Sequence, residues 1–245
     1  MKKIIEIMYK NAQENDDIIK EIYTFTHTVM VKSKRLGISS QWAGFPGEIN
    51  NCQKYACYDH FIGKKVSDTF LELINGSPRE VSIAMATLNS VIPIPDNIKA
   101  GNVFDELYPI VKNEKTVFIG HFPRAEKWKR EGLDISIVEL VPRPGDIHWN
   151  KADKVLEESS IVFITGITLL NKTFMDVIKK TPNAIYRVLM GPTVAVLKEF
   201  LDFGIDFVGG TYIENEDLAI KYWQRGGAGM RKAPKGAVRS IFISK

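Results

Sequence analysis

The fold is decided by a stretch that reads Thr116-Val117-Phe118-Ile119-Gly120-His121-Phe122-Pro123-Arg124. Its first four residues are β-branched or apolar, as in a strand buried on both faces of a sheet, and the glycine that follows permits a sharp turn. Short apolar runs recur downstream, separated by helix-length segments; they cover 135–140, 161–165, 185–190, 206–208 and 238–243. This alternation is typical of βαβ units. The sequence therefore predicts a Rossmann-like parallel sheet from about Lys115 onward.

The first hundred residues follow a different pattern. Periodicity predicts, in order, an amphipathic helix over 3–20, a strand over 21–32, a second strand after Gly37, a third strand over about 51–58, and helices near 67–74 and 78–90. Strands followed by helices indicate an α+β unit. Prolines and glycine cluster in 91–101, where we place a domain boundary. The predicted domains are an α+β domain over 1–98 and a Rossmann-like ligand-binding domain over 99–245.

Composition limits the classes of function. The 245 residues are 44% hydrophobic and 25% charged, and the net charge of +4 is spread without long blocks, so we expect no nucleic-acid partner. No apolar run is long enough to span a membrane, and Glu6 and Lys10 interrupt the stretch that a signal peptide needs. We expect a cytoplasmic protein with no membrane partner, in which Cys52 and Cys57 stay reduced. A homo-oligomer is left open.

The loops after the predicted strands carry the candidate site, because ligands of open α/β sheets bind beyond the carboxyl ends of the strands. These loops are Gly120–Arg124, Pro142–Asp146, Thr165–Thr168 and Gly191–Thr193. Thr168 and Thr193 are expected to cap helices, with Asn171 in the first turn of one of them. Helix N-termini together with Arg124 and Arg143 favour an anionic ligand group.

The first loop fails as a dinucleotide fingerprint. Glu139 lies 19 residues after Gly120 (139 − 120), near the distance of a ribose-binding acid. However, the loop lacks the second and third glycines, and His121 and Phe122 would crowd a pyrophosphate. We therefore do not expect NAD as a cofactor.

A metal ion or a metal chelate is another candidate ligand. The candidate metal ligands are His121, Asp146 and His148, the last two of which would share one face of an extended segment. The histidines follow no zinc spacing, and Cys52 and Cys57 are a weak zinc signal without partners. If the chain is an enzyme, which the sequence leaves open, His121 and Asp146 are the candidate catalytic proton-transfer groups.

These loops resemble the putative heavy-metal chelation family. The resemblance is carried by Gly120–Pro123, Pro142–Asp146, Ile164–Thr173 and Gly191–Thr193, and upstream by Gly37, the segment around Gly63 and Ala84–Asn89. It implies an enolase-N-terminal-like domain packed on the Rossmann-like domain, with a site in the cleft between them. Thr193 departs from the family's serine but keeps the hydroxyl.

The resemblance implies a specific set of ligand-binding residues. They are Asn89, Gly120, His121, Phe122, Pro144, Gly145, Asp146, Thr165, Gly166, Thr168, Asn171, Thr173, Gly191 and Pro192, to which the loops add Arg143 and Thr193. The leading hypothesis is a protein that binds a small anionic molecule or a metal chelate in the interdomain cleft, with heavy-metal chelation as the implied role. The alternative is an enzyme that acts on such a ligand with a nucleotide or S-adenosylmethionine co-substrate near Glu139.

Overall fold

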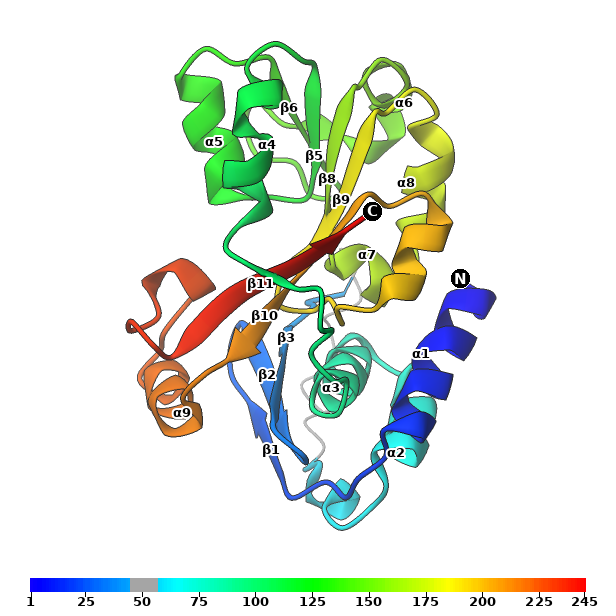
Figure 1. The fold of residues 1–245 in the computed structure, drawn as a ribbon, viewed down its shortest axis with the longest axis vertical. Coiled ribbons are helices and arrows are strands. Elements are labelled where there is room, and N and C mark those ends of the chain that lie inside the picture. Colours follow the sequence, from blue (N-terminus) through cyan, green and yellow to red (C-terminus); the bar gives the residue numbers. More distant parts are fainter. Residues whose placement is uncertain (45–56) are drawn as a thin grey trace.

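The computed structural model describes residues 1–44 and 57–245. A small antiparallel sheet with helices comes first in the chain, and a larger, mostly parallel sheet with helices on both faces follows (Figure 1). The small sheet has the order β1 (Glu21–Thr24), β2 (Thr28–Lys32) and β3 (Leu36–Ser40). This arrangement confirms the predicted α/β class with a smaller α+β unit in front.

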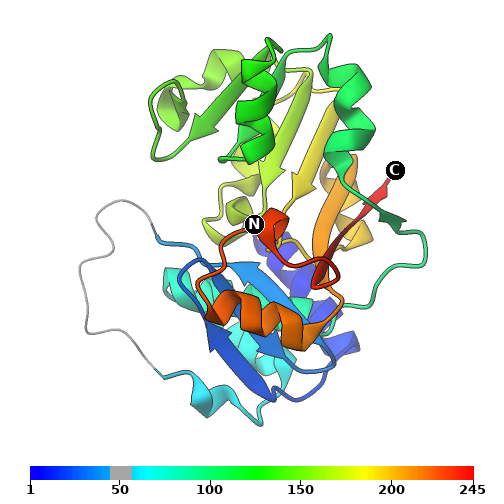
Figure 2. The same cartoon turned by 90° about the vertical axis from the view of Figure 1, so that its left-hand side faces the viewer.

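The small sheet is covered on both faces. Helices α1 (Lys2–Glu14), α2 (Val66–Leu73) and α3 (Pro78–Asn89) pack on one face, and α9 (Glu216–Gln224), from near the other end of the chain, packs on the opposite one (Figure 2). Alternation along β2 explains this, because Val29 and Val31 enter the core of the first helices while Met30 packs with Trp223 of α9. A short helix, η2 (Asp59–Phe61), precedes α2.

Two predicted elements of this unit have different bounds. The single strand expected over 21–32 was wrong: the chain turns after Thr24, where the Phe25 N–H donates to the Thr28 carbonyl at 2.8 Å, so β1 and β2 form a hairpin. The helix expected to run to residue 20 ends at Glu14, and Asp16 instead accepts bonds from the N–H and hydroxyl of Ser67 at 3.0 and 2.6 Å. Most of the strand expected over 51–58 lies outside the described residues.

The large sheet has the strand order β4-β11-β10-β9-β8-β5-β6-β7. Its strands are β4 (Lys99–Ala100), β5 (Thr116–Ile119), β6 (Ile135–Glu139), β7 (Ile147–His148), β8 (Ile161–Thr165), β9 (Tyr186–Met190), β10 (Phe207–Ile213) and β11 (Val238–Ser244). Strands β5 to β10 run parallel, and β11 is antiparallel to both of its neighbours. The chain moves from β5 outward to β6 and β7 and then crosses back to β8, so the order reverses between β5 and β8.

Helices cover both faces of the large sheet. One face holds α4 (Val103–Val111) and α5 (Pro123–Arg130), packed through an aromatic cluster in which Phe118 and Phe163 stack at 4.7 Å between ring centroids. The other face holds α6 (Asp153–Glu157), α7 (Ile167–Leu170), α8 (Phe174–Lys180) and η4 (Lys198–Phe203). Two short helices, η3 (Trp149–Lys151) and η5 (Met230–Lys232), lie in connections.

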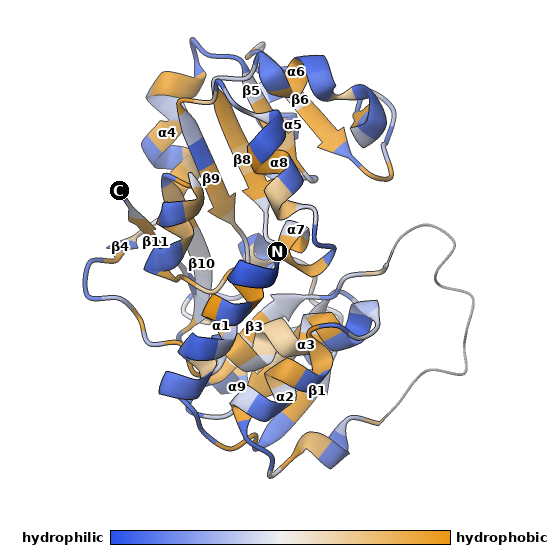
Figure 3. Ribbon diagram, turned by 90° about the vertical axis from the view of Figure 1, so that its right-hand side faces the viewer, coloured by the Kyte–Doolittle hydropathy of each residue, from blue (hydrophilic) through white to orange (hydrophobic). Residues whose placement is uncertain are grey.

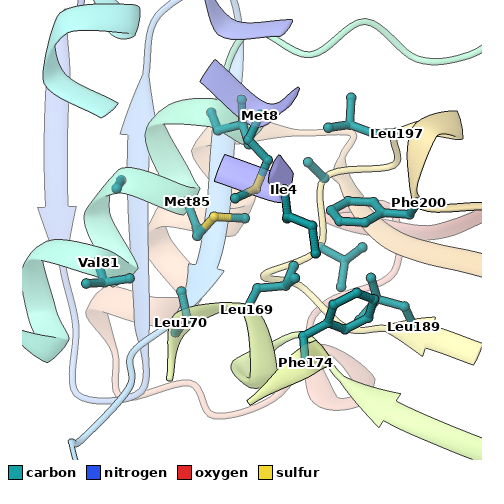
Figure 4. Close-up of a cluster of buried hydrophobic side chains, with 14 of the residues drawn as sticks. Ile4, Met8, Val81, Met85, Leu169, Leu170, Phe174, Leu189, Leu197 and Phe200 are labelled. Atoms are coloured by element: carbon teal, nitrogen blue, oxygen red, sulfur yellow. The ribbon is translucent and has the colours of Figure 1, made fainter. Parts of the chain in front are cut away.

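The two units share one hydrophobic core. Ile4 and Met8 of α1 and Met85 of α3 lie in one cluster with Leu169 of α7 and Phe174 of α8 (Figure 4). Val162 and Ile164 of β8 and Leu189 of β9 belong to the same cluster, and β8 is largely hydrophobic along its length (Figure 3). The domain boundary at 98/99 stays a prediction. Within residues 1–44 and 57–245, no helix has the length and apolar character needed to cross a bilayer.

Gly37 should be indispensable for the packing of α3 on β3. A Cβ at this position would lie 2.2 Å from the Ala86 carbonyl oxygen and 2.3 Å from the Ser90 nitrogen, both backbone atoms that cannot turn away. We expect Gly37→Ala to lower the free energy of unfolding by at least about 2 kcal/mol in urea denaturation. Gly132→Ala is the control, because its φ of +85° is unfavourable for alanine but its Cβ would meet open space; it should cost only about 1 kcal/mol. Equal losses would contradict the packing argument.

Candidate functional site

A cleft of about 400 Å³ opens at the carboxyl ends of β5, β6 and β8, where the strand order reverses. The large sheet contributes Gly120, Glu139 and Thr165 to its lining, and the small sheet contributes Ser40 and Trp42, which end and follow β3. Gly120 has a φ of +98°, and a Cβ there would lie 2.7 Å from the Thr165 side chain. The cleft therefore lies between the two units, at the edge where open α/β sheets bind ligands.

The cleft lining is a mixture of hydroxyl, amide and apolar groups. Thr165, Thr168, Asn171 and Thr173 contribute the polar atoms, and Trp149 is one of the apolar residues on the lining. The Thr168 hydroxyl donates to the Thr165 carbonyl at 2.7 Å, and the Asn171 Oδ1 accepts from the hydroxyl of Thr173, also at 2.7 Å. No lysine or arginine occurs among the lining residues that the structure describes. Among the residues that the structure describes, an anionic group inside the cleft would thus find hydrogen-bonding groups but no lysine or arginine.

A second concavity, the basic groove, adjoins the cleft at His121. It has a volume of about 640 Å³ and is lined by Lys129, Arg130 and Arg143 together with Glu126 and Asp146. The Lys129 ammonium donates to the Gly145 carbonyl at 3.0 Å, and the Arg143 guanidinium lies 3.7 Å from the Glu126 carboxylate. Three cations against two carboxylates make this groove the part of the site that attracts anions.

His121 lies between two carboxylates. Its Nε2 forms a short hydrogen bond with Glu126, and this bond lowers the pKa of the Glu126 carboxyl. Its Nδ1 lies 3.5 Å from Asp146 Oδ2, within reach of an ion pair, yet it is buried and makes no hydrogen bond. The two atoms are therefore close together without forming a hydrogen bond. Asp146 Oδ2 is held by the backbone N–H of Arg143 at 3.0 Å.

Glu139 is half-buried at the end of β6 and faces the cleft. Burial raises the pKa of its carboxyl, while hydrogen bonds from the backbone of Leu140 and His121 partly oppose this shift. The carboxyl is therefore easier to protonate in the folded protein than in the unfolded chain.

The predicted site residues fall into three places. Six of them line the cleft: Gly120, His121, Thr165, Thr168, Asn171 and Thr173. The basic groove is lined by His121 as well, together with Arg143, Pro144, Gly145 and Asp146. Asn89, Phe122, Gly166, Gly191, Pro192 and Thr193 line neither concavity. As ligand-binding residues, all of these stay predictions.

Asn89 and Thr193 join the two units behind the cleft. The Asn89 side-chain amide donates to the Ile38 carbonyl at 2.8 Å and to the Pro192 and Thr193 carbonyls at 3.3 Å. The Thr193 hydroxyl accepts the Ser40 N–H at 3.1 Å. These bonds tie the loop after β9 to β3 and thereby hold Ser40 at the cleft.

Several local predictions were wrong. Thr168 caps no helix: it lies inside the four-residue α7, and α8 starts separately after Lys172, which has a φ of +64°. Asn171 ends α7 instead of starting a helix, and Thr193 is followed by irregular chain before η4. The expected set of helix N-termini around one anion is therefore not formed.

Arg124 and Phe122 lie outside both the cleft and the basic groove. Arg124 points away from the cleft, where it pairs with Asp105 at 3.1 Å and lies over the ring of Phe104. Phe122 packs against Phe104 and Phe118 in the aromatic cluster. Both side chains stabilise α4 and α5 on the sheet.

Asp146 and His148, which were expected to share one face of an extended segment, make separate contacts. Asp146 closes a turn with Arg143, whereas His148 Nδ1 accepts the Asn150 N–H at 3.1 Å at the start of η3. Within the described part of the chain, no group of three or more His, Cys, Asp or Glu side chains converges as metal ligands would. Cys57 is exposed, and Cys52 lies outside the described residues.

Sequence reasoning missed the part of the cleft formed by Ser40, Trp42, Leu140, Val141 and Trp149. Trp42 and Ser40 belong to the small unit, whose position over the sheet no local pattern reveals. Trp149 and Val141 carry a usable signal, because they flank the Pro142–Asp146 loop.

Comparisons with known proteins confirm the resemblance of the loops. Residues 102–242 match the DUF364 family, which is described as putative heavy-metal chelation. An uncharacterised protein of Methanocaldococcus jannaschii is 31% identical over 153 residues, which cover 58% of this chain. The match likewise spans only 58% of the length of that relative.

Two crystal structures from the same family share the fold. A protein of unknown function from Desulfitobacterium hafniense has a TM-score of 0.83 at 21% identity, with 100% of this chain and 99% of that chain covered. One from Pyrococcus horikoshii has a TM-score of 0.77 at 16% identity, with 99% and 98% covered. At these identities the likeness extends to the fold alone.

The Thr193 hydroxyl should be needed for the contact between the units. Thr193→Val leaves the part-buried Ser40 N–H without its acceptor, and an unsatisfied donor away from water typically costs about 1–3 kcal/mol. We expect amide hydrogen exchange at Ser40 to become faster by roughly tenfold in this variant. Thr193→Ser, which keeps the hydroxyl, should leave the exchange rate of Ser40 unchanged. A similar rate in both variants would show that another group satisfies this N–H.

Glu139 should make stability depend on pH. Because its pKa is raised in the folded state, the folded protein retains a proton that the unfolded chain has lost. Stability therefore falls as pH rises from the ordinary value near 4.5 through the folded pKa and is constant above it. Glu139→Gln removes this loss. The difference in free energy of unfolding between the variant and the natural protein, measured by urea denaturation, should therefore shift in favour of the variant as pH increases from about 4 to about 7. A difference in free energy of unfolding that does not change with pH would rule out Glu139 as the origin of the pH dependence.

Proposed function

Since this chain belongs to the DUF364 family, described as putative heavy-metal chelation, we propose that it binds a small anionic molecule, such as a metal chelate, across the cleft and the basic groove. The observation that carries the proposal is the junction at His121, which lines both concavities. A ligand that lies across this residue contacts both units of the protein. In this proposal the large sheet acts as a Rossmann-like ligand-binding domain. The first unit, which corresponds to the family's enolase-N-terminal-like domain, covers the bound ligand.

The charge distribution supports a ligand with two different parts. The cleft offers hydroxyl, amide and indole groups, whereas the groove offers Lys129, Arg130 and Arg143. Of the two concavities as lined by described residues, the groove is the one whose lysine and arginines can give anionic groups charge-assisted hydrogen bonds. An apolar or hydroxyl-bearing body is suited to the cleft, where Trp42 and Trp149 supply flat surfaces.

A chelate suits these residues better than a bare cation does. The described residues hold no cluster of three protein ligands, so a free ion would keep most of its water. The three cations of the groove would also repel it. A metal that arrives with its own anionic ligands avoids both costs, because the chelator brings the missing donors and the opposite charge.

Glu139 supports a second candidate, an enzyme that uses a nucleotide or S-adenosylmethionine as co-substrate. Glu139 lines the cleft at the end of β6. Strand β6 neighbours β5 on the side opposite β8, the strand at which the order reverses. Dinucleotide-binding folds place a ribose-binding acid at this position. In this candidate His121 or Asp146 would transfer the proton.

Tryptophan fluorescence provides a direct test of the first candidate. Trp42 and Trp149 line the cleft, whereas Trp128 and Trp223 are buried at 1% and 2% exposure. A panel of citrate, nitrilotriacetate and their nickel complexes should contain a ligand that changes the emission and raises the melting temperature. Arg143→Ala should weaken this binding by roughly tenfold, since a charge-assisted bond is lost.

The matched control is Lys151→Ala, which removes a cation that lines neither concavity and should bind like the natural protein. Trp149→Phe should keep the thermal shift but lose part of the emission change. The proposal fails if no member of the panel binds, or if Arg143→Ala and Lys151→Ala weaken binding equally.

A further inference from the structure

His121 Nδ1 is a buried polar atom with no hydrogen bond. Its side chain is 16% exposed, and the neighbouring Asp146 side chain is only 5% exposed. Leaving such an atom unpaired in a folded protein is costly, so it requires an explanation. The His121 side chain lines both the cleft and the groove, so a ligand bound there is a candidate partner for this atom.

The tautomer of a neutral His121 imidazole follows from the contact of its other nitrogen with Glu126. An ionised Glu126 can only accept, so the hydrogen of the short contact lies on His121 Nε2. In the neutral ring, Nδ1 then carries a free lone pair, and Asp146 Oδ2 lies 3.5 Å from this nitrogen. Metal-bound histidines show this same arrangement, because their second N–H usually donates to a carboxylate that fixes the ring and strengthens the ligand.

The spacing of the two candidate donors agrees with a shared metal ion. His121 Nδ1 and Asp146 Oδ2 are 3.5 Å apart. Two ligands on adjacent positions of one metal ion lie roughly 3.0 to 3.4 Å apart, given metal–ligand bonds of about 2.1 Å. Two such ligands both point at the metal and not at each other, which agrees with the absent hydrogen bond. The backbone N–H of Arg143 donates to Asp146 Oδ2 and so fixes the position of this carboxylate oxygen.

We infer that His121 Nδ1 and Asp146 Oδ2 coordinate the metal of an incoming chelate on adjacent positions, with Glu126 orienting the imidazole and the basic groove holding the anionic groups of the chelator. Imidazole and carboxylate together suit divalent zinc, nickel, cobalt or copper. This inference rests on the proposed function and assigns the metal to named atoms. Only two protein donors take part, so the complex forms only when the chelator leaves adjacent positions open.

Nickel complexes test this requirement with untagged protein. Nitrilotriacetate leaves adjacent positions on nickel free, whereas ethylenediaminetetraacetate fills all of them. We expect calorimetry to detect binding of the first complex and not of the second. His121→Ala and Asp146→Asn should weaken binding by roughly tenfold or more, and Glu126→Gln by a smaller factor. His148→Ala is the matched control, since its imidazole lies outside both concavities.

A spectroscopic readout separates coordination from a general loss of structure. X-ray absorption at the nickel edge should show an imidazole in the complex with the natural protein and none with His121→Ala, while circular dichroism confirms that the variant is folded. Equal binding of both nickel complexes, or no effect of His121→Ala, would overturn the inference.

The outcome for metal-free nitrilotriacetate distinguishes the two proposals. If it binds as tightly as its nickel complex and depends on Arg143, the metal assignment is wrong while the anion-binding function stands. If the nickel complex does not bind at all, the metal assignment fails. The anion-binding proposal then fails as well only if the whole ligand panel is negative.

Discussion

The shared hydrophobic core is the constraint on which the rest of the structure depends. Helix α1 inserts Ile4 and Met8 between α3 and the helices on the large sheet, where they meet Leu169 and Phe174. This burial fixes the small sheet against the carboxyl edge of the large one. Polar contacts such as the Asn89 amide bonds then set the exact position. Ser40 and Trp42 therefore reach the cleft because apolar surfaces far from it must be buried.

Strand and helix types followed from the local pattern, whereas the contacts between them did not. The apolar runs of β5, β6, β8 and β9 lie where periodicity placed them, because strands buried on both faces leave a strong signal. Thr193 shows the limit of such reasoning. Its position after a glycine and a proline is typical of a helix cap, but its hydroxyl accepts a bond from Ser40, 153 residues away. Tertiary contacts of this kind override local preference.

The candidate site likewise has one part that local sequence predicts and one part that it does not. Loop residues such as Gly120 and Thr165 could be placed from the rule that ligands bind beyond strand ends. The division into a hydroxyl-rich cleft and a basic groove could not be predicted from the sequence. Arg124 and Arg143 look equivalent in sequence, yet they lie on different sides of α5. Their separation depends on the aromatic cluster, which draws the guanidinium of Arg124 toward Phe104.

The position of α9 has a consequence for how the chain folds. Glu216 at its start accepts the N–H of Leu36, 180 residues earlier, and Trp223 covers the face of β2 that carries Met30. On the ribosome, the small sheet thus emerges long before the helix that completes it. Until then one apolar face stays open to solvent, which slows folding through contacts of high sequence separation and exposes the nascent chain to aggregation.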